Sequence, residues 1–393
     1  MGYSEDYPFL RDGETVELIK KSKTLFFLRL PESENESLVN SIVEVYGKDV
    51  LVVKPLSQDQ KGESPSQAKK QCEDERGQHD QSLEVEKACK DGFKLVIIAD
   101  PNLTKDNLYE CQRKSLPFFY TSILINPSDQ EEKNQAPYPL FFGWFVNEEN
   151  SRELRDLAEK IYDECLNNKK FSEEFTKSLI PDKEGQKPDP QKYFSSKDYV
   201  VGPIMLHCTA FYSNYGEVTK TKEYVSKEQV QKAIGKALRV KVIGLLVTPR
   251  SLGFRLKLNQ EDLPLWDEDG GASVDPADGG ESAAISRTQD DQCIFTAMSP
   301  TCGTGSRAHF SVKSGPGIQP VKTGEDLVQL IEDEQKAARE KTEDEQKATR
   351  EKTEDELLTI QLDCGKARCY GEGNWMVYFN KPREAEVLFS SFF

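Results

Sequence analysis

The 393-residue sequence lacks three kinds of signal, and each absence excludes a class of protein. The nine cysteines are odd in number, scattered and never spaced as C-x-x-C. This pattern argues against a zinc site and a disulfide framework, and it indicates free thiols in a reducing compartment. No apolar run approaches the roughly 20 residues that cross a bilayer, and the start, MGYSEDYPF, lacks the basic and apolar regions of a signal peptide. We therefore expect a cytoplasmic protein without a resident metal ion.

Lipidation signals and an excess of positive charge are also missing. Asp6 stands where a myristoylation signal at Gly2 needs Ser or Thr, and the last four residues, SSFF, contain no cysteine for prenylation. These departures predict no lipid anchor and argue against membrane association. The formal charge of −16 disfavours general binding to duplex nucleic acid, because an acidic chain repels polyanions at long range. A local basic pocket is still compatible with this charge.

The length and the pattern of apolar residues predict two domains. Residues 1–135 alternate strand and helix signals, which indicates a small parallel α/β sheet. A second pattern fills residues 136–393 and starts with FFGWFV, which we interpret as a buried strand. Within it, Ser226 to Gln229 has the spacing of a capping box and predicts a helix whose apolar stripe ends at Leu238.

Two segments of the second domain have the composition of insertions. The segment at about 267–304 is rich in Asp, Gly, Ser and Ala at its start, and we expect a disordered acidic insert. An 11-residue repeat, DEQKAAREKTE and then DEQKATREKTE, occupies about 332–356. Its Glu and Lys residues alternate at i,i+4 spacing, which favours a solvent-exposed helix over the alternative of a partner-binding rod.

Residues 30–39, LPESENESLV, occupy the place of a phosphate-binding loop, between a buried strand and a helix that we expect to begin at Ser37. Such a loop holds phosphates with the backbone N–H groups of glycines and with a lysine. Neither residue type is present, and the loop instead carries Glu32, Glu34, Asn35 and Glu36. Because carboxylates repel phosphates, we expect no ATP or GTP binding and no other cofactor.

Histidine is scarce, and two of the three histidines lie in matching contexts. His207 precedes Thr209 and His309 precedes Ser311, so both have the pattern H-x-[ST] on a strand-like run, whereas His79 lies in a polar segment. Side chains two apart in a strand share one face, so each motif presents an imidazole and a hydroxyl to the same surface. Two such strands side by side would form one symmetric pocket.

This set of groups suits the hydrolysis of a cyclic phosphodiester. One neutral imidazole can deprotonate water, one imidazolium can protonate the leaving oxygen, and two hydroxyls can bind the non-bridging oxygens. Histidine serves both proton transfers because its pKa lies near neutrality, so the reaction needs no metal. The alternative is that each histidine is a core residue that happens to precede a hydroxyl.

Longer stretches around these motifs resemble a known family. LHCTAFYSNYG at 206–216, GSRAHFSV at 305–312 and PVKTGEDLVQLI at 320–331 are similar to vertebrate 2′,3′-cyclic-nucleotide 3′-phosphodiesterases, members of the two-histidine phosphoesterase superfamily. The resemblance covers nearly the whole chain outside the inserts. It implies a degenerate P-loop, polynucleotide-kinase-like domain with a parallel sheet, followed by a bilobal phosphoesterase domain with antiparallel sheets. The acidic insertions resemble the regeneration-induced neuronal members from fish more than the basic myelin form.

The resemblance also implies an activity, the conversion of 2′,3′-cyclic nucleotides, free or at RNA ends, to 2′-phosphates. His207 and Thr209 match the first catalytic motif of the family, and His309 matches the second. Ser311 stands where the family usually has Thr; it keeps the hydroxyl but lacks the methyl that restricts its rotamer. We expect His309 to activate water and His207 to protonate the 3′ oxygen, although the two roles could be exchanged.

Four further positions are assigned to substrate binding by the same resemblance. Tyr212 falls at the family's base-stacking aromatic residue, and Arg307 is expected to contact base or phosphate. Phe141 replaces a tyrosine that is usual in the family, and Val321 lies in a segment that lines the pocket. The family's C-terminal CaaX tail is absent. A second reading is a catalytically weak or inactive member that acts as a scaffold for RNA or cytoskeletal partners.

Overall fold

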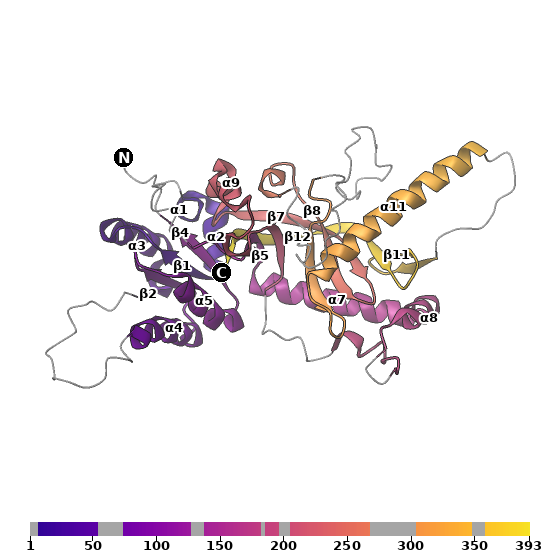
Figure 1. Ribbon diagram of the computed structural model, residues 1–393, viewed down its shortest axis with the longest axis horizontal. Coiled ribbons are helices and arrows are strands. Elements are labelled where there is room, and N and C mark those ends of the chain that lie inside the picture. The colour runs from indigo at the N-terminus through magenta and orange to yellow at the C-terminus, as the bar shows by residue number, and fades with distance from the viewer. Residues whose placement is uncertain are drawn as a thin grey trace.

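The computed structural model describes residues 7–53, 74–126, 137–181, 185–195, 205–267, 304–347 and 358–393, and the structural statements below concern these residues. A parallel α/β sheet lies at one end of an elongated molecule, and a larger antiparallel sheet occupies the centre and the other end (Figure 1). The predicted fold class is therefore confirmed. The boundary near residue 135 stays a prediction, because 127–136 lie outside the described residues.

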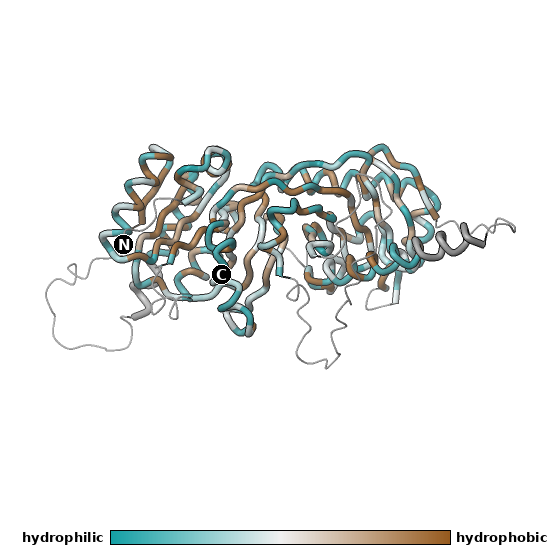
Figure 2. Tube along the Cα trace, turned by 90° about the horizontal axis from the view of Figure 1, so that it is seen from above, coloured by the Kyte–Doolittle hydropathy of each residue, from teal (hydrophilic) through white to brown (hydrophobic). Residues whose placement is uncertain are grey.

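The N-terminal sheet has four parallel strands in the order β2-β3-β1-β4. They are β1 (Lys23–Leu28), β2 (Val50–Val53), β3 (Leu95–Ala99) and β4 (Tyr120–Ile125). One face packs against α1 (Pro8–Arg11), α2 (Gly13–Lys21) and α3 (Glu32–Tyr46), and the other packs against α4 (Asp74–Asp91) and α5 (Lys105–Ser115). Short 3-10 turns follow α3 and α5, namely η1 (Gly47–Asp49) and η3 (Leu116–Phe118). Because both faces are covered, the strands are continuous apolar runs, which appear brown in Figure 2.

The frame of the phosphate loop differs from the prediction in one respect. Helix α3 begins at Glu32 and not at Ser37, so Glu32 and Glu34 lie in its first turn and the loop after β1 shrinks to residues 29–31. The Asn35 side chain, 3% exposed, accepts a hydrogen bond from the Leu30 N–H at 3.2 Å and donates one to the Leu30 carbonyl at 2.8 Å. This amide occupies the backbone groups of the turn, and it ties the turn to the helix.

The second sheet is antiparallel and has eight strands. They are β5 (Phe141–Val146), β6 (His207–Tyr212), β7 (Ala237–Val247), β8 (Ser251–Lys257), β9 (His309–Ser314), β10 (Thr359–Leu362), β11 (Gly365–Cys369) and β12 (Trp375–Phe392). The long strand β12 pairs with β7 along most of its length, and its other edge pairs first with β11 and then with β5. The path β6-β5-β12-β7-β8-β9 curls until its end strands β6 and β9 contact each other, so the sheet is nearly closed.

Helices and short turns cover this sheet. They are α7 (Glu148–Asn167), α8 (Lys169–Ser178), α9 (Thr221–Ser226), α10 (Glu228–Ala233), α11 (Lys322–Lys347), η4 (Tyr193–Ser195), η6 (Asn214–Gly216) and η7 (Leu263–Leu265). The helix predicted to run to Leu238 was wrong, since α10 ends at Ala233 and Ala237 already belongs to β7. The Ser226 hydroxyl donates to the Lys222 carbonyl at 2.7 Å instead of capping α10. Gly235, with φ of 74°, turns the chain between the two elements.

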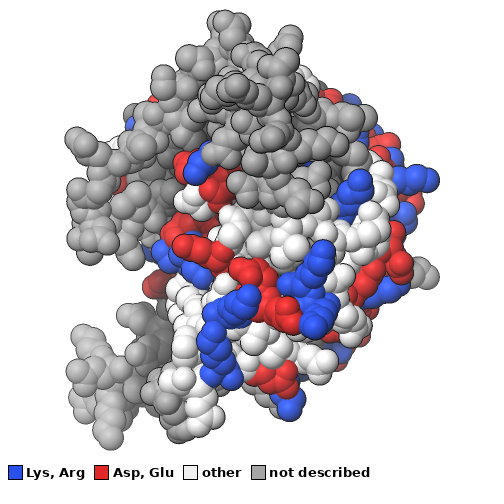
Figure 3. All heavy atoms as spheres, turned by 90° about the vertical axis from the view of Figure 1, so that its right-hand side faces the viewer, with Lys and Arg blue, Asp and Glu red and all other residues white. Residues whose placement is uncertain are grey.

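The predicted acidic insert lies almost wholly outside the described residues, at 268–303, whereas the repeat segment predicted at about 332–356 lies outside them only from residue 348. Helix α11 continues through the first part of the 11-residue repeat, and Figure 1 shows its far end pointing away from the body. On the described part of that end of the molecule, acidic and basic side chains are interspersed among uncharged ones (Figure 3). No helix of the described residues is both long and apolar enough to cross a membrane.

Candidate active site

The two H-x-[ST] motifs lie on strands with matching surroundings. Strands β6 and β9 both begin at a histidine, and each pairs with a neighbouring strand that has glycine opposite the hydroxyl residue. The register pairs are Phe145 with His207, Gly143 with Thr209, Arg255 with His309, and Gly253 with Ser311. In both pairs the register shifts immediately beyond the glycine. Such a bulge bends the strand beside the motif and orients its side chains.

The two glycines are required by close packing. A Cβ atom on Gly143 would lie 2.3 Å from the Cys208 carbonyl oxygen, and one on Gly253 would lie 2.4 Å from the Thr323 methyl carbon. Both distances are far below van der Waals contact. The strands that carry the motifs can therefore approach their neighbours only where no side chain intervenes.

The contact between β6 and β9 brings both motifs to one site. The backbone N–H of His309 faces the buried Cys208 thiol, and the positive charge of the His309 imidazole acts to lower the pKa of His207. The structure thus places His207, Thr209, His309 and Ser311 around one region at the seam of the sheet. The Ser311 hydroxyl donates to the Pro320 carbonyl at 3.2 Å.

Each imidazole is held by the backbone in the same way. His207 Nδ1 lies 3.3 Å from the Met205 carbonyl oxygen, and His309 Nδ1 lies 2.8 Å from the Arg307 carbonyl oxygen. A carbonyl can only accept, so in the neutral ring Nδ1 carries the hydrogen and Nε2 keeps its lone pair. Both histidines therefore direct the same kind of atom, an Nε2 acceptor, away from the backbone.

Burial keeps both rings neutral before a substrate binds. It lowers the pKa of His207 to about 4, opposed by the Met205 carbonyl and reinforced by His309 and Arg155. Burial also lowers the pKa of His309, opposed by its contact with the Arg307 carbonyl. The Arg307 guanidinium lowers it further, whereas the Asp326 carboxylate raises it.

Aromatic rings form the wall behind His207. Phe141 stacks on the imidazole with ring centroids 4.8 Å apart, and Phe145 stacks less closely at 5.9 Å. Phe392 stacks on the other side of Phe141 at 5.1 Å. Tyr212 lies opposite Phe141 in the register and therefore on the same face as the imidazole, and its hydroxyl donates to Asn214 at 3.2 Å.

The first turn of α11, which belongs to the segment around Val321 that we expected to line the pocket, lies beside the second histidine. A Cβ atom on Gly324 would lie 3.1 Å from His309 Cε1, so the helix start contacts the ring directly. Val321, 47% exposed, immediately precedes this helix. The N-terminus of a long helix carries a partial positive charge, which favours an anion. The first three N–H groups of α11, those of Lys322, Thr323 and Gly324, already donate to carbonyls of the preceding turn.

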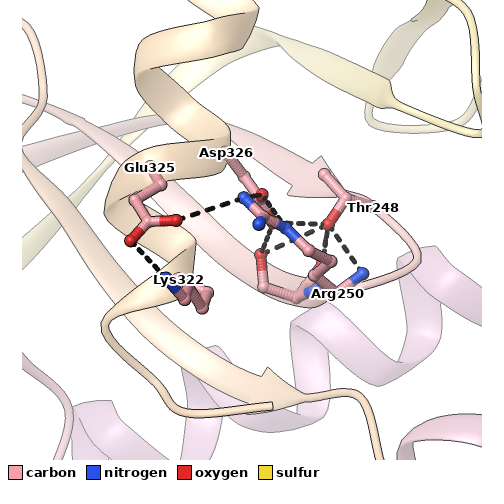
Figure 4. Close-up of polar contacts among 6 residues, drawn as sticks. Thr248, Arg250, Lys322, Glu325 and Asp326 are labelled. Carbon is pink, nitrogen blue, oxygen red and sulfur yellow. Dashed lines mark hydrogen bonds and ion pairs between the residues drawn. The ribbon is translucent and has the colours of Figure 1, made fainter. Parts of the chain in front are cut away.

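A buried carboxylate fixes the start of α11. Asp326 accepts hydrogen bonds of 2.6 Å from Thr248 Oγ1, Ser251 Oγ and Arg250 Nε, and it also pairs with Arg250 Nη2 (Figure 4). We call Asp326 with these three partners the α11 anchor. Glu325 and Lys322 form an exposed pair beside it at 2.6 Å. The α11 anchor ties the helix to the β7–β8 turn, next to the strand that pairs with β9.

Sequence reasoning also missed Arg155 on α7. Its Nη1 donates to the Val312 carbonyl at 3.0 Å, one residue beyond Ser311, and its charge influences His207. It therefore connects a helix of the first lobe to the motif strand of the second. The sequence offers no signal for it, because an arginine on an amphipathic helix is ordinary. Among the described residues, no group of three or more His, Cys, Asp or Glu could hold a metal ion.

The fold joins a parallel α/β domain to an antiparallel sheet, and two strands of that sheet each carry a histidine and a hydroxyl two residues apart. This is the combination that the family resemblance implies. The family model described as 2′,3′-cyclic nucleotide 3′-phosphodiesterase (CNP or CNPase) matches residues 138–393, and the chain belongs to this family. Curated relatives with the name 2′,3′-cyclic-nucleotide 3′-phosphodiesterase include those of Rattus norvegicus, 26% identical, and Mus musculus, 25% identical. Each alignment covers 98% of this chain and 87% of the relative. The family resemblance of the sequence is confirmed.

Proposed function

We propose that this protein hydrolyses 2′,3′-cyclic nucleotides, free or at RNA ends, to 2′-phosphates. The observation that carries the proposal is the mirrored pair of H-x-[ST] strands at one seam, with both Nδ1 atoms held by backbone carbonyls. The family membership and the names of the relatives support the same reaction. A resident metal is not needed, because the two imidazoles supply both proton transfers.

In the proposed mechanism His309 Nε2 removes a proton from the attacking water. The water oxygen then attacks phosphorus, the bond from phosphorus to the 3′ oxygen breaks, and His207 Nε2 donates the proton that this oxygen takes up. Thr209 and Ser311 bind the non-bridging oxygens, and the positive end of the α11 dipole stabilises their charge. The anionic substrate itself stabilises the imidazolium that burial otherwise disfavours.

Substrate binding uses the aromatic wall and the flanking groups. Tyr212 stacks on the base, and Arg307 contacts the base or the phosphate. The backbone around Val321 closes the pocket over the phosphate. Phe141 positions His207 by stacking, and this position lacks the hydroxyl of the tyrosine usual in the family.

The first experiment measures the hydrolysis of 2′,3′-cyclic AMP with added chelator and separates the 2′ and 3′ products. The wild-type protein should form the 2′-phosphate. His207→Ala and His309→Ala should each lower kcat by ~10²-fold or more, whereas His79→Ala, the change of the remaining histidine, should keep the wild-type rate. Wild-type rates in either of the first two variants would refute the assignment.

A substrate with sulfur at the 3′ bridging position separates the two roles. A thiolate leaves without being protonated, so this analogue should restore much of the rate to His207→Ala and little to His309→Ala. The reverse pattern would exchange the acid and the base. No rescue in either variant would argue that neither histidine is the acid.

We also propose that the N-terminal domain does not bind ATP or GTP. The glutamates in the first turn of α3 repel phosphates, and Asn35 occupies the backbone of the turn. Calorimetric titration of the full chain with ATP and Mg²⁺ should give no binding heat. Micromolar affinity would contradict this proposal.

A further inference from the structure

A stripe of exposed cationic and aromatic side chains lies on the N-terminal domain and has no part in the reaction above. Lys105, Tyr109 and Arg113 are exposed and follow one another at i,i+4 spacing, so they share one face of α5. Few large apolar side chains are exposed among the described residues, and Tyr109, 43% exposed, is the aromatic one.

The stripe is continuous with the candidate active site. Beyond Tyr212, strand β6 leads into η6, where Asn214 and Tyr215 adopt left-handed backbone conformations with φ of 46° and 56°. This turn places the Tyr215 ring beneath Lys105, whose Nζ lies 3.7 Å from the ring centroid. Burial raises the pKa of the Tyr215 hydroxyl, and the Tyr109 and Tyr212 phenols raise it further. Lys105 therefore joins the turn after β6, the strand of His207, to the exposed face of α5.

Acidic side chains also lie beside the two cations of this stripe. The nearest acidic side chains are engaged: Glu110 binds Arg113 at 2.7 Å, and Glu217 accepts a hydrogen bond from Asn214 at 2.5 Å. Asp106 is exposed on the neighbouring face of α5. Aromatic rings that alternate with cations can bind single-stranded nucleic acid, because the rings stack on bases and the cations contact phosphates.

We propose that Lys105, Tyr109, Tyr215 and Arg113, here called the strand surface, bind the nucleotides that precede a 2′,3′-cyclic phosphate end of RNA. The inference rests on the proposed function, because the terminal nucleotide must lie between the two histidines. On the His309 side, the start of α11 contacts the imidazole ring. The RNA chain therefore leaves the site on the His207 side, along β6. A preceding base stacks on Tyr109, and the phosphates contact Lys105 and Arg113.

The experiment compares 2′,3′-cyclic AMP with a pentaribonucleotide that ends in a 2′,3′-cyclic phosphate. The wild-type protein should have a KM about tenfold lower for the pentamer, and Tyr109→Ala should remove this difference, as expected for the loss of one base–aromatic stack. Kinetics with 2′,3′-cyclic AMP should not change, because a mononucleotide does not reach α5. Tyr109→Phe keeps the ring and should behave as wild type.

A binding measurement makes the test independent of catalysis. Fluorescence anisotropy with a labelled pentamer ending in a 2′-phosphate should show weaker binding in Lys105→Gln, with a salt dependence reduced by about 0.7 in log–log slope per lost phosphate contact. Lys169→Gln, at an 87% exposed lysine side chain on α8, serves as the charge control and should bind as wild type.

The outcomes separate the two proposals. Hydrolysis of the mononucleotide without a preference for the pentamer, or a preference that survives Tyr109→Ala, overturns the strand surface and leaves the proposed function intact. Pentamer binding that depends on Tyr109, without hydrolysis of either substrate, supports the surface and overturns the proposed function. Equal weakening in Lys105→Gln and Lys169→Gln would indicate general charge attraction and would also overturn the surface.

Discussion

Replacement of Asp326 by alanine is the most informative perturbation of the α11 anchor. The change removes the acceptor shared by Thr248, Ser251 and Arg250. Thr248 and Ser251 are 2% and 0% exposed, so their hydroxyls lose a partner that water cannot replace. The side chain of Arg250 is 40% exposed and can return to solvent.

The magnitude follows from these burials. An unsatisfied buried donor costs about 1–3 kcal/mol. Thr248 Oγ1 keeps a long contact of 3.4 Å with the Ser251 carbonyl, so one of the two losses is partly offset. We therefore expect Asp326→Ala to lower the free energy of unfolding by about 2–4 kcal/mol.

Activity should fall more than stability alone explains. The anchor holds the turn in which Gly324 contacts His309, so its release displaces the helix start whose dipole we assign to the phosphate charge. The kcat for 2′,3′-cyclic AMP should decrease at least ~10-fold at a temperature where the variant is folded. Urea unfolding followed by fluorescence gives the stability, and initial rates give kcat and KM.

Glu325→Gln is the matched control. It removes a neighbouring charge on the same helical turn, whose pairs with Lys322 at 2.6 Å and with Arg250 at 3.6 Å are exposed and should each contribute less than ~1 kcal/mol. Wild-type stability of Asp326→Ala would refute the account of the anchor. A destabilised variant with wild-type kcat would show that the start of α11 takes no part in catalysis.

Three further predictions concern stability. Glu334→Ala should cost about 3–5 kcal/mol in urea unfolding, because it leaves the fully buried Arg255 guanidinium without its carboxylate, now 2.8 Å away; replacing both residues by Met and Leu should restore most of the loss. Gly143→Ala should cost about 1–3 kcal/mol and lower activity, because its methyl group overlaps the Cys208 carbonyl; equal stability would contradict the close approach. Burial depresses the folded-state pKa of His207, so its contribution to stability is present above pH 6.5 and is lost as the pH falls towards 4; His207→Gln should flatten the pH dependence of unfolding in that window.

Local sequence information was sufficient to predict a strand or a motif whose structure depends on its own residues. The apolar runs predicted both sheets, and the spacing of His207 and Thr209 placed two functional groups on one face of a strand. The recurrence of the pattern at His309 predicted a second, equivalent strand. Such patterns survive folding because the alternation of side chains in a strand is a property of the backbone.

The prediction failed where distant segments decide the local structure. The pattern extends α10 to Leu238, but Gly235 packs so closely on Phe9 that a Cβ atom there would lie 3.0 Å from the ring, and the chain enters β7 instead. Similarly, α3 starts early because Asn35 replaces the phosphate as the partner of the Leu30 backbone. The contact of Gly324 with His309 joins residues of two elements that no local pattern relates.

The parallel domain supports the catalytic wall even though its phosphate loop has lost the usual chemistry. The last part of β12 lies against β4: Ser390 Oγ donates to the Ser122 carbonyl, and the Phe393 N–H donates to Gln112 at 2.6 Å. Phe393 is buried in the core of that domain, beside Phe27. The preceding residue, Phe392, stacks on Phe141, which stacks on His207. The wall behind the imidazole is therefore fixed at one end in the parallel domain, so that domain holds His207 in place through packing.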